Sequence, residues 1–424
     1  MRLKVHHVSS ALLWLAYFSF SLVENIRPPC ALDIIELTSS SMDTIGTAVS
    51  VYIVFYCISS LLFGSINKGI DRRDVIAVCL VFAAATDGVI PFLTSGFQLI
   101  VSYAISGLFL GVLDVECNSW MLMAWGSESN PFLQAMHFSY AAGSAIAPLM
   151  SAPFLSSRTT LISTHPTGNT SSTVDVSDSR IAIPLGTVTV IALASALLII
   201  IFRVTNSCSV HVELEELQED NSASRVSLEV TESPILRRHN RKILISVLGC
   251  LLMCAYSTIE LNLLVYLPDL LVFADIHVSR PTAAYVLTVF NTCYALSRAL
   301  SIITARKFSL TTLLSINLIV IGVGLVMQLV FVNTSQIMTW ISCAILGSGI
   351  GSTFPSIIAL VNHKVGDGYN INGFLMFAGR AAGVPSSLVM GHMLEQNPLI
   401  LVYFCLSLYA IACLSFGLLL SAPV

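Results

Sequence analysis

Aromatic and acidic side chains recur at helical spacing along the first apolar run of the chain. Four of them share one helical face, at positions i, i+3, i+7 and i+10: Trp14, Tyr17, Ser21 and Glu24. An aromatic face beside a carboxylate suits a polyhydroxylated ligand, because a sugar ring stacks on the aromatic ring and its hydroxyls bond to the acid. The same pattern is typical of an interfacial aromatic belt with a Glu24–Arg27 pair.

The fourth apolar run, residues 97–124, carries small and polar side chains on one helical face. They are spaced at i, i+4, i+7 and i+11: Gly107, Gly111, Asp114 and Asn118. A charge at the middle of a bilayer is costly, so Asp114 needs a binding or pairing role. With the Asn118 amide it predicts a buried site for Na⁺, a proton or a solute. The alternative is a structural pair between Asp114 and Arg298 or another buried base. Glu116 lies about 200° round the helix from Asp114 and cannot share its face.

Three later runs add polar residues at positions that we expect to lie inside the membrane. His137, on a face with Gln134, could relay protons or bond a sugar hydroxyl, although a lone histidine in a helix is often a packing residue. Glu260 lies near the middle of the seventh run, and Arg298 shares a face of the eighth run with Tyr294. A Glu260–Arg298 ion pair, either static or switching, is compatible with this spacing.

These patterns predict two overlapping sets of site residues. We expect the coupling ion to bind at Glu24 and Asp114. We expect solute contacts from eight side chains: Trp14, Tyr17, Glu24, Asn118, Gln134, His137, Glu260 and Arg298. No catalytic residue, metal site or cofactor is predicted beyond Na⁺ or H⁺ as a coupling ion. The sequence contains no GxSxG, P-loop or HExxH motif, so we expect no enzyme and no ATP-driven pump.

Composition places these residues in a membrane protein. The chain has 424 residues, of which 55% are hydrophobic and 10% charged, whereas soluble domains average about 25% charged residues. The net charge of −4 is small, and the basic residues are dispersed, which argues against nucleic-acid binding. Most of the eleven cysteines lie in apolar runs without a CxxC motif, so we expect packing residues rather than a disulfide framework.

Twelve apolar runs recur along the sequence, each near the ~20 residues that a bilayer requires. They cover residues 8–32, 45–66, 74–94, 97–124, 132–155, 181–202, 243–271, 281–304, 309–331, 337–361, 371–394 and 397–420. We therefore predict an all-α membrane protein with two six-helix halves, residues 1–202 and 243–424, joined by a cytosolic linker at 203–242. The first run resembles a secretory signal, but no small-x-small cleavage site follows it, and we expect a membrane helix.

Charge distribution and glycosylation motifs predict the same orientation. Of the 20 Lys and Arg residues, three lie within helices and three in loops predicted to be outside, which leaves 14 on the cytosolic side if both termini are cytosolic. Sequons at Asn169 and Asn333 both fall in outside loops. The halves also echo each other, because Gly107 and Gly111 in the fourth run match Gly347 and Gly351 in the tenth. Paired six-helix halves are typical of transporters whose binding site lies between the halves.

The fourth and fifth runs resemble the sodium-dependent glucose transporter 1 family, a branch of the major facilitator superfamily. The matching residues are Gly111-Val112-Leu113-Asp114, Asn118, Trp125-Gly126, Pro131, Gln134-Ala135, His137-Phe138, Gly143 and Ala147-Pro148. The resemblance also covers Glu260 and Arg298. It implies the major facilitator fold and facilitative or Na⁺-coupled transport of glucose or a similar sugar at the plasma membrane. Fucose-permease relatives use acids in helices 1 and 4 for proton coupling, which Glu24 and Asp114 match by position only.

The sequence departs from the family pattern at several positions. Of the superfamily signature between helices 2 and 3, Gly64 and Arg72-Arg73 remain, but Lys68 replaces the acid and Asp71 replaces the second glycine. Arg27 and Arg380 are basic residues at positions where this branch is not expected to carry them. The sequence thus predicts a secondary or facilitative sugar transporter in a lipid bilayer. The alternatives are transport of another small organic solute, or a non-transporting receptor with a transporter fold.

Overall fold

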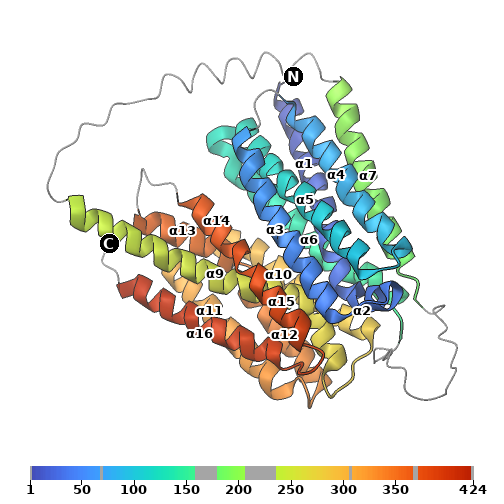
Figure 1. The fold of residues 1–424 in the computed structure, drawn as a ribbon. Helices are drawn as coiled ribbons and strands as arrows, with labels where there is room; N and C mark the ends of the chain where they lie inside the picture. Colours follow the sequence, from blue (N-terminus) through green and yellow to red (C-terminus); the bar gives the residue numbers. More distant parts are fainter. Residues whose placement is uncertain are drawn as a thin grey trace, which may run out of the picture.

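The computed structural model describes residues 2–66, 70–157, 179–205, 235–304, 308–365 and 371–421, and in these ranges the chain forms helices and no strands. The helices lie in two groups (Figure 1), which we call the first half, α1 to α7, and the second half, α9 to α16. The bounds in the first half are α1 Arg2–Asn25, α2 Arg27–Thr38, α3 Met42–Ile66, α4 Arg72–Val89, η1 Ile90–Phe92, α5 Gly96–Trp125, η2 Gly126–Glu128, α6 Ser129–Ser151, η3 Ala152–Phe154 and α7 Ala182–Thr205. Those in the second half are α9 Ile235–Phe273, α10 Arg280–Thr304, α11 Leu310–Phe331, α12 Gln336–Ile350, α13 Thr353–Val365, α14 Asn372–Ala381, α15 Gly383–Met393 and α16 Ile400–Ser421.

Each of the twelve predicted apolar runs is helical. Nine helical spans within the described ranges are long and apolar enough to cross a membrane. The runs of α1, α6 and α10 are not among these nine, and each of these three helices carries polar residues that were predicted from the sequence to line a site. The boundaries 1–202, 203–242 and 243–424 remain predictions, and most of the linker, residues 206–234, lies outside the described residues.

Three runs that we expected to be single helices are broken, and proline explains each break. A proline nitrogen cannot donate to the carbonyl four residues before it. Pro28 and Pro29 follow the break between α1 and α2. Pro355 lies in the first turn of α13 and Pro385 in the first turn of α15, directly after the other two breaks. The expectation of one continuous helix over 8–32, 337–361 and 371–394 was therefore wrong.

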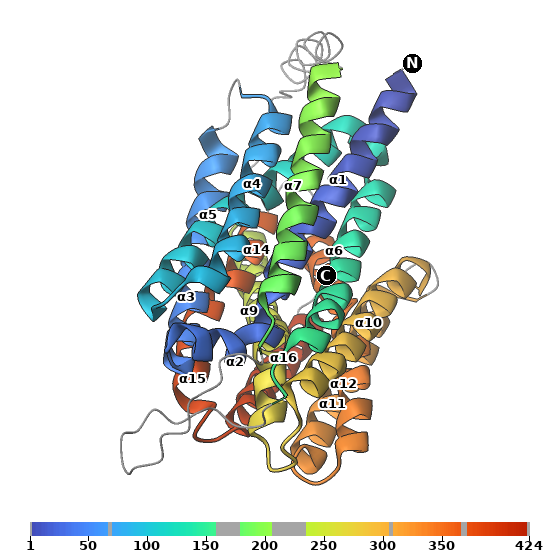
Figure 2. The same cartoon turned by 90° about the vertical axis from the view of Figure 1, so that its right-hand side faces the viewer.

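After its break the chain turns, and α2 runs across one end of the molecule (Figure 2). Almost all of its residues are buried, and it packs against α9 and α10 as well as against helices of the first half. We call this end of the molecule, where α3 and α10 begin, the α2 end. The opposite end, where α1 begins, is the N-terminal end. Helix α2 thus lies between the two halves at one end.

Glycines bring helix backbones into contact at equivalent places in the two halves. In α5, Gly107 and Gly111 contact the backbone of α3 at Tyr52 and Tyr56. At the end of α12 and directly after it, the repeated pair contacts the backbone of α10 at two further aromatic residues. The pairs there are Gly347 with Phe290 and Gly351 with Tyr294. The predicted echo between the halves is thus a repeated pair of glycine contacts, which lets helices approach closely where lipid provides no hydrophobic driving force.

The two halves meet mainly toward the α2 end. There α3 packs on α15, with the backbones of Gly46 and Gly391 in contact, and the Ser50 hydroxyl donates to the Val384 carbonyl at 2.8 Å. Helix α6 packs on α10, where the Asn291 amide donates to a carbonyl of α6 at 2.7 Å. Toward the N-terminal end the helices of the halves diverge (Figure 1). The α2 end is therefore closed in this structure.

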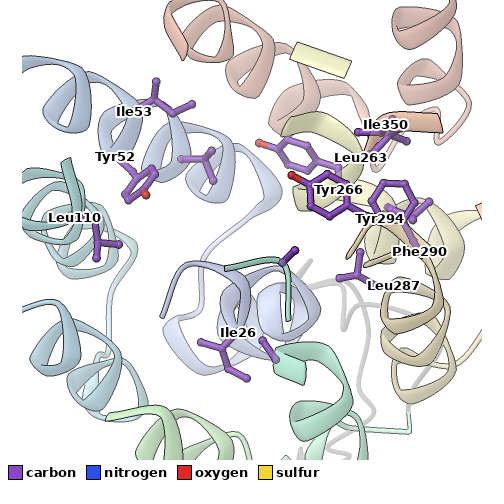
Figure 3. Close-up of a cluster of buried hydrophobic side chains, with 14 of the residues drawn as sticks. Ile26, Tyr52, Ile53, Leu110, Leu263, Tyr266, Leu287, Phe290, Tyr294 and Ile350 are labelled. Carbon is purple, nitrogen blue, oxygen red and sulfur yellow. The ribbon is translucent and has the colours of Figure 1, made fainter. Parts of the chain in front are cut away.

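Buried apolar and aromatic side chains continue across the contact between the halves (Figure 3). Tyr52 and Leu110 belong to the first half, whereas Tyr266, Phe290 and Tyr294 belong to the second. All five are almost inaccessible to solvent. This core places the tyrosine hydroxyls described below inside the protein, where they need polar partners.

We predict that Gly111→Ala destabilises the protein, because the new Cβ would meet the α3 backbone at Tyr56 and the Ser59 hydroxyl. The expected loss is about 1–3 kcal/mol, the usual cost of overpacking. Thermal unfolding of the detergent-purified protein measures it. Gly186→Ala, in α7, is the matched control, since nothing lies within 4 Å of its Cβ position. Equal unfolding temperatures for the two variants would contradict the proposed role of the close contact.

Candidate functional site

The Asp114 carboxylate in α5 is held by neutral hydrogen-bond donors. The Tyr17 hydroxyl of α1 and the Tyr56 hydroxyl of α3 each donate to one of its oxygens. The Asn118 amide, one helical turn further on, donates at 2.9 Å and also reaches the Tyr17 hydroxyl at 3.2 Å. Three helices of the first half thus converge on one acid. The predicted residues Tyr17, Asp114 and Asn118 lie together.

No cation forms an ion pair with Asp114 among the described residues. The structural alternative, a pair with Arg298, does not form, because Arg298 donates through Nε to the Gly351 carbonyl at 3.1 Å and stacks on the Tyr294 ring. That carbonyl is available because Pro355, four residues later, has no N–H to donate to it. Asp114 is therefore a half-buried acid whose charge no protein cation offsets directly.

Glu24 has a different environment, which joins the two halves. Its carboxylate accepts from the Tyr52 hydroxyl at 2.9 Å and from the Tyr140 hydroxyl, both in the first half. Arg380, from α14 of the second half, approaches it to 3.5 Å. The alternative interpretation, a Glu24–Arg27 pair, does not hold among the described residues, because Arg27 is buried and bound to other residues of the first half. Its partners are Asp87 at 2.7 Å, Thr86 at 3.0 Å and Ser106 at 2.7 Å.

Arg380 connects the two acids into one network. Its guanidinium lies over the Tyr56 ring, 4.7 Å from the ring centre, and the Tyr56 hydroxyl donates to Asp114. The same guanidinium reaches Glu24. A charge change at either carboxylate is therefore felt by an arginine of the opposite half, since this interior has a low dielectric.

The second half supplies its own tyrosine–acid pair. The Tyr294 hydroxyl donates to Glu260 at 2.8 Å, and the Arg298 guanidinium lies 4.7 Å from the Tyr294 ring centre. The expected Glu260–Arg298 ion pair does not form among the described residues, because Tyr294 contacts both groups. Tyr294 in α10 is equivalent to Tyr56 in α3, because a glycine of a neighbouring segment contacts the backbone of each tyrosine: Gly351 at Tyr294 and Gly111 at Tyr56.

The remaining predicted residues line α1 and α6 toward the N-terminal end. Trp14 donates to the Phe132 carbonyl at 3.1 Å and stacks on its ring, so it packs against α6. The His137 ring meets the Tyr17 ring edge to face at 5.5 Å. Gln134 is half-buried in α6, and no hydrogen bond joins its side chain to the acids within the described chain.

The signature residues at the N-terminal end form structural ion pairs. Arg72 reaches the buried Glu116 at 2.9 Å, and Arg203 of α7 reaches Asp74 at 2.7 Å. Partial burial alone would raise the pKa of the Asp71 carboxyl. Hydrogen bonds from Arg73 and the nearby charge of Arg203 outweigh burial and hold this pKa below its usual range. These pairs tie α4 to α5 and α7. Glu116 thus has a partner away from the Asp114 network.

Of the two asparagines predicted to be glycosylated, one lies within the described residues and the other does not. Asn333 lies in the turn between α11 and α12 at the α2 end, where its side-chain carbonyl accepts from the Asp275 backbone at 3.3 Å. Asn169 lies outside the described residues. Modification at either position remains a prediction.

The sequence reasoning missed four residues that complete the network: Tyr52, Tyr56, Tyr140 and Arg380 as a partner of Glu24. A signal for two of them was present, because Tyr52 and Tyr56 are spaced at i, i+4 in the second apolar run. Only the contact of α3 with α5 shows that this face meets Gly107 and Gly111.

A small cavity lies next to Glu24, on the side toward the α2 end. It has a volume of about 50 Å³, enough for a few water molecules. Its lining combines polar residues of the first half with apolar residues of α9: Glu24, Arg27, Tyr52, Tyr103, Leu261 and Val265. No group of three or more acidic, histidine or cysteine side chains within the described ranges could hold a metal ion. The arrangement suits a proton or a lone hard cation held by carboxylate and phenol oxygens, beside aromatic rings.

Comparison with known proteins places this chain in a family. A family model described as Major Facilitator Superfamily matches residues 13–384. The chain is 24% identical to sodium-dependent glucose transporter 1A of Mus musculus, over 82% of this chain and 81% of that protein. It is 28% identical to Major facilitator superfamily domain-containing protein 4A of Danio rerio, in a match over 37% of this chain that spans only 30% of that protein.

The solved structures agree on the fold. The chain superposes on the crystal structure of a D-xylose-proton symporter with a TM-score of 0.70, at 13% sequence identity, over 98% of this chain and 97% of that one. At this identity the likeness concerns the fold alone. Together with the family match over most of the chain, it shows that this protein belongs to the Major Facilitator Superfamily of multi-pass membrane transporters.

Proposed function

We propose that this protein moves a sugar across the membrane by alternating access, coupled to Na⁺ or H⁺ at Asp114 and Glu24. The observation that carries the proposal is the environment of Asp114. An acid inside the membrane that has three neutral donors and no protein cation is suited to bind a transported cation. Glu24 is the second acid of the same network, and it already has a cationic partner in Arg380.

The rings around the two acids support a sugar as the solute. The Tyr17 ring lies 5.5 Å from the His137 ring and 5.9 Å from the Tyr140 ring, measured between ring centres. Aromatic faces beside hydrogen-bonding oxygens suit the C–H faces and hydroxyls of a sugar ring. The names of the sodium-dependent glucose transporter and of the D-xylose-proton symporter point the same way.

The closed α2 end defines which side has access in this state. The excess of basic residues at the N-terminal end and the sequon at Asn333 favour cytosolic termini and an outward-facing α2 end. With that orientation, and with the plasma membrane as the proposed location, the structure corresponds to an inward-facing state. The solute would then exchange with the cytosol between the diverging halves.

Arg298 favours a second candidate, a solute that carries an anionic group. Among the described residues its guanidinium makes one hydrogen bond, through Nε, and no ion pair. Arginine binds carboxylate and phosphate in a bidentate manner when its terminal nitrogens are available. A sugar acid would use both Arg298 and the hydroxyl-binding face.

We predict that Asp114→Asn lowers ion-stimulated sugar uptake about tenfold, within the usual range for coupling between two ligands. The amide keeps the shape of the side chain but removes the negative charge. The measurement is uptake of labelled glucose, and of glucuronate for the second candidate, in cells without endogenous transport. Na⁺ is replaced in one arm and the pH is shifted in the other.

Asp43→Asn is the control for this experiment, because Asp43 is an exposed acid at the α2 end that pairs only with the exposed His392. It should leave uptake unchanged at equal surface expression. Normal ion-coupled uptake by Asp114→Asn would remove Asp114 from the mechanism. If the unmodified protein at the cell surface transports neither compound, the sugar proposal is wrong.

A second prediction concerns the pair between the halves. Glu24→Gln and Arg380→Gln should each lower the unfolding temperature, whereas the double variant should lose less than the sum of the two. The expected coupling is about 1 kcal/mol, because the pair is half-exposed and its atoms are 3.5 Å apart. Thermal unfolding of the four proteins forms the double-mutant cycle. Strict additivity would mean that Arg380 does not stabilise Glu24.

A further inference from the structure

Asp269 is a buried acid that the proposed site does not use. It lies one turn from the end of α9 and is 1% exposed. Its Oδ2 atom has no hydrogen-bond partner, and the carboxylate forms no ion pair with any described residue. A buried carboxylate that lacks such partners is costly. An acid that is unpartnered in one state of a mobile protein can have its partner in another state.

Arg280, the first residue of α10, is the candidate for such a partner. The connection between α9 and α10 closes where the Val278 amide donates to the Leu271 carbonyl at 3.3 Å. In α9, Asp269 precedes Leu271 by two residues. In the antiparallel α10, Arg280 follows Val278 by two residues. Arg280 is also the charged group whose field acts on the Asp269 carboxylate. Both side chains are buried.

In this structure Arg280 is bound to the other half. It reaches Asp33 and Glu36 of α2, both at 2.5 Å. Asp33 is held in place by two further donors, the Ser156 amide at 2.9 Å and the Ser179 hydroxyl at 2.7 Å. We call Arg280, Asp33 and Glu36 the α2 clasp. It joins the first half to the second at the closed end.

Opening of the α2 end must break this clasp, since its acids belong to one half and its arginine to the other. A buried guanidinium that loses its partners is strongly destabilising. Asp269, however, moves with Arg280, because both belong to the α9–α10 hairpin. We propose that Asp269 is the second partner of Arg280, which pairs with Asp33 and Glu36 when the α2 end is closed and with Asp269 when it is open.

This exchange explains how two states can lie close in free energy. A solute shifts an equilibrium only by the difference in its affinity for the two states, so neither state can be far more stable than the other. With Asp269 present, Arg280 has an acidic partner in both states. Three further buried atoms near the contact between the halves also lack partners in the closed state: Asn262 Oδ1, Asn291 Oδ1 and Ser387 Oγ. Within the described residues, the hydrogen-bonding capacity of the polar groups at the closed contact is thus incompletely used.

The inference rests on alternating access but not on the identity of the solute or ion. Its test therefore measures conformation rather than uptake. Spin labels on cysteines introduced at Ser41 and Gln396, which are exposed on opposite halves at the α2 end, report the distance between the halves in the purified full-length protein. The protein without the two introduced cysteines gives the background signal.

The double substitution Asp33→Asn and Glu36→Gln weakens the closed clasp and should increase the long-distance population. Adding Asp269→Asn to that protein should lower the long-distance population at least about fivefold, because the open state loses its ion pair. Asp269→Glu keeps the charge and should preserve most of that population. An unchanged distance distribution after Asp269→Asn would overturn the proposal.

Two controls separate partner exchange from a general effect of the substitution. With Arg280→Gln in place, Asp269→Asn should no longer shift the distances, since its partner is already absent. Asp43→Asn alters an exposed contact with His392 at the same end and should change the distances little. If Asp269→Asn acts equally with and without Arg280, Arg280 is not its partner. A failure of sugar uptake with normal distance shifts would overturn only the proposed solute.

Discussion

The close backbone contact between α5 and α3 is the constraint on which the site depends. Gly107 and Gly111 allow the two helices to touch at Tyr52 and Tyr56. Because the helices are so close, the Tyr56 hydroxyl reaches Asp114 on the neighbouring helix. The same pair of contacts recurs between Gly347 and Gly351 and the α10 backbone, and Tyr294 of α10 reaches Glu260 on a third helix, α9. In each half, a glycine pair brings a tyrosine helix close to its neighbour, and that tyrosine binds an acid.

The helix breaks at prolines are a second feature that positions the charged side chains. Within a continuous helix, each carbonyl is occupied by the amide four residues later. Pro355 leaves the Gly351 carbonyl free, and Arg298 fills the vacancy. Pro28 and Pro29 end α1 directly after Glu24 and redirect the chain into α2, which carries Asp33 to Arg280. The breaks thus occur next to the buried charged groups, a placement that is typical of transporters with discontinuous helices.

The sequence predicted the fold. It also predicted that certain residues of the candidate site lie together, and the limits of that prediction have physical causes. Helical periodicity within one run placed Asp114 and Asn118 on a shared face, and the structure joins them to Tyr17. Periodicity carries no information on which helices become neighbours. Arg380 and Glu24 are separated by 356 residues in the chain, so their pairing could not follow from spacing. The predicted local pair of Glu24 and Arg27 failed because Asp87, from another helix, offered Arg27 a fully buried partner.

Charge is distributed unevenly across the contact between the halves. In every arginine–carboxylate pair that joins the halves among the described residues, the acid belongs to the first half and the arginine to the second. These pairs are Glu24 with Arg380, and Asp33 and Glu36 with Arg280. A cation that binds to an acid of the first half therefore weakens the attraction that holds the halves together. Among the described residues Asp114 has no such partner. If cations bind at the two acids as proposed, Asp114 takes one without breaking a contact between the halves, whereas Glu24 exchanges Arg380 for it. Under the proposed coupling, occupation of Asp114 changes the charge of the site, and occupation of Glu24 removes one of the ion pairs that join the halves, while the α2 clasp remains.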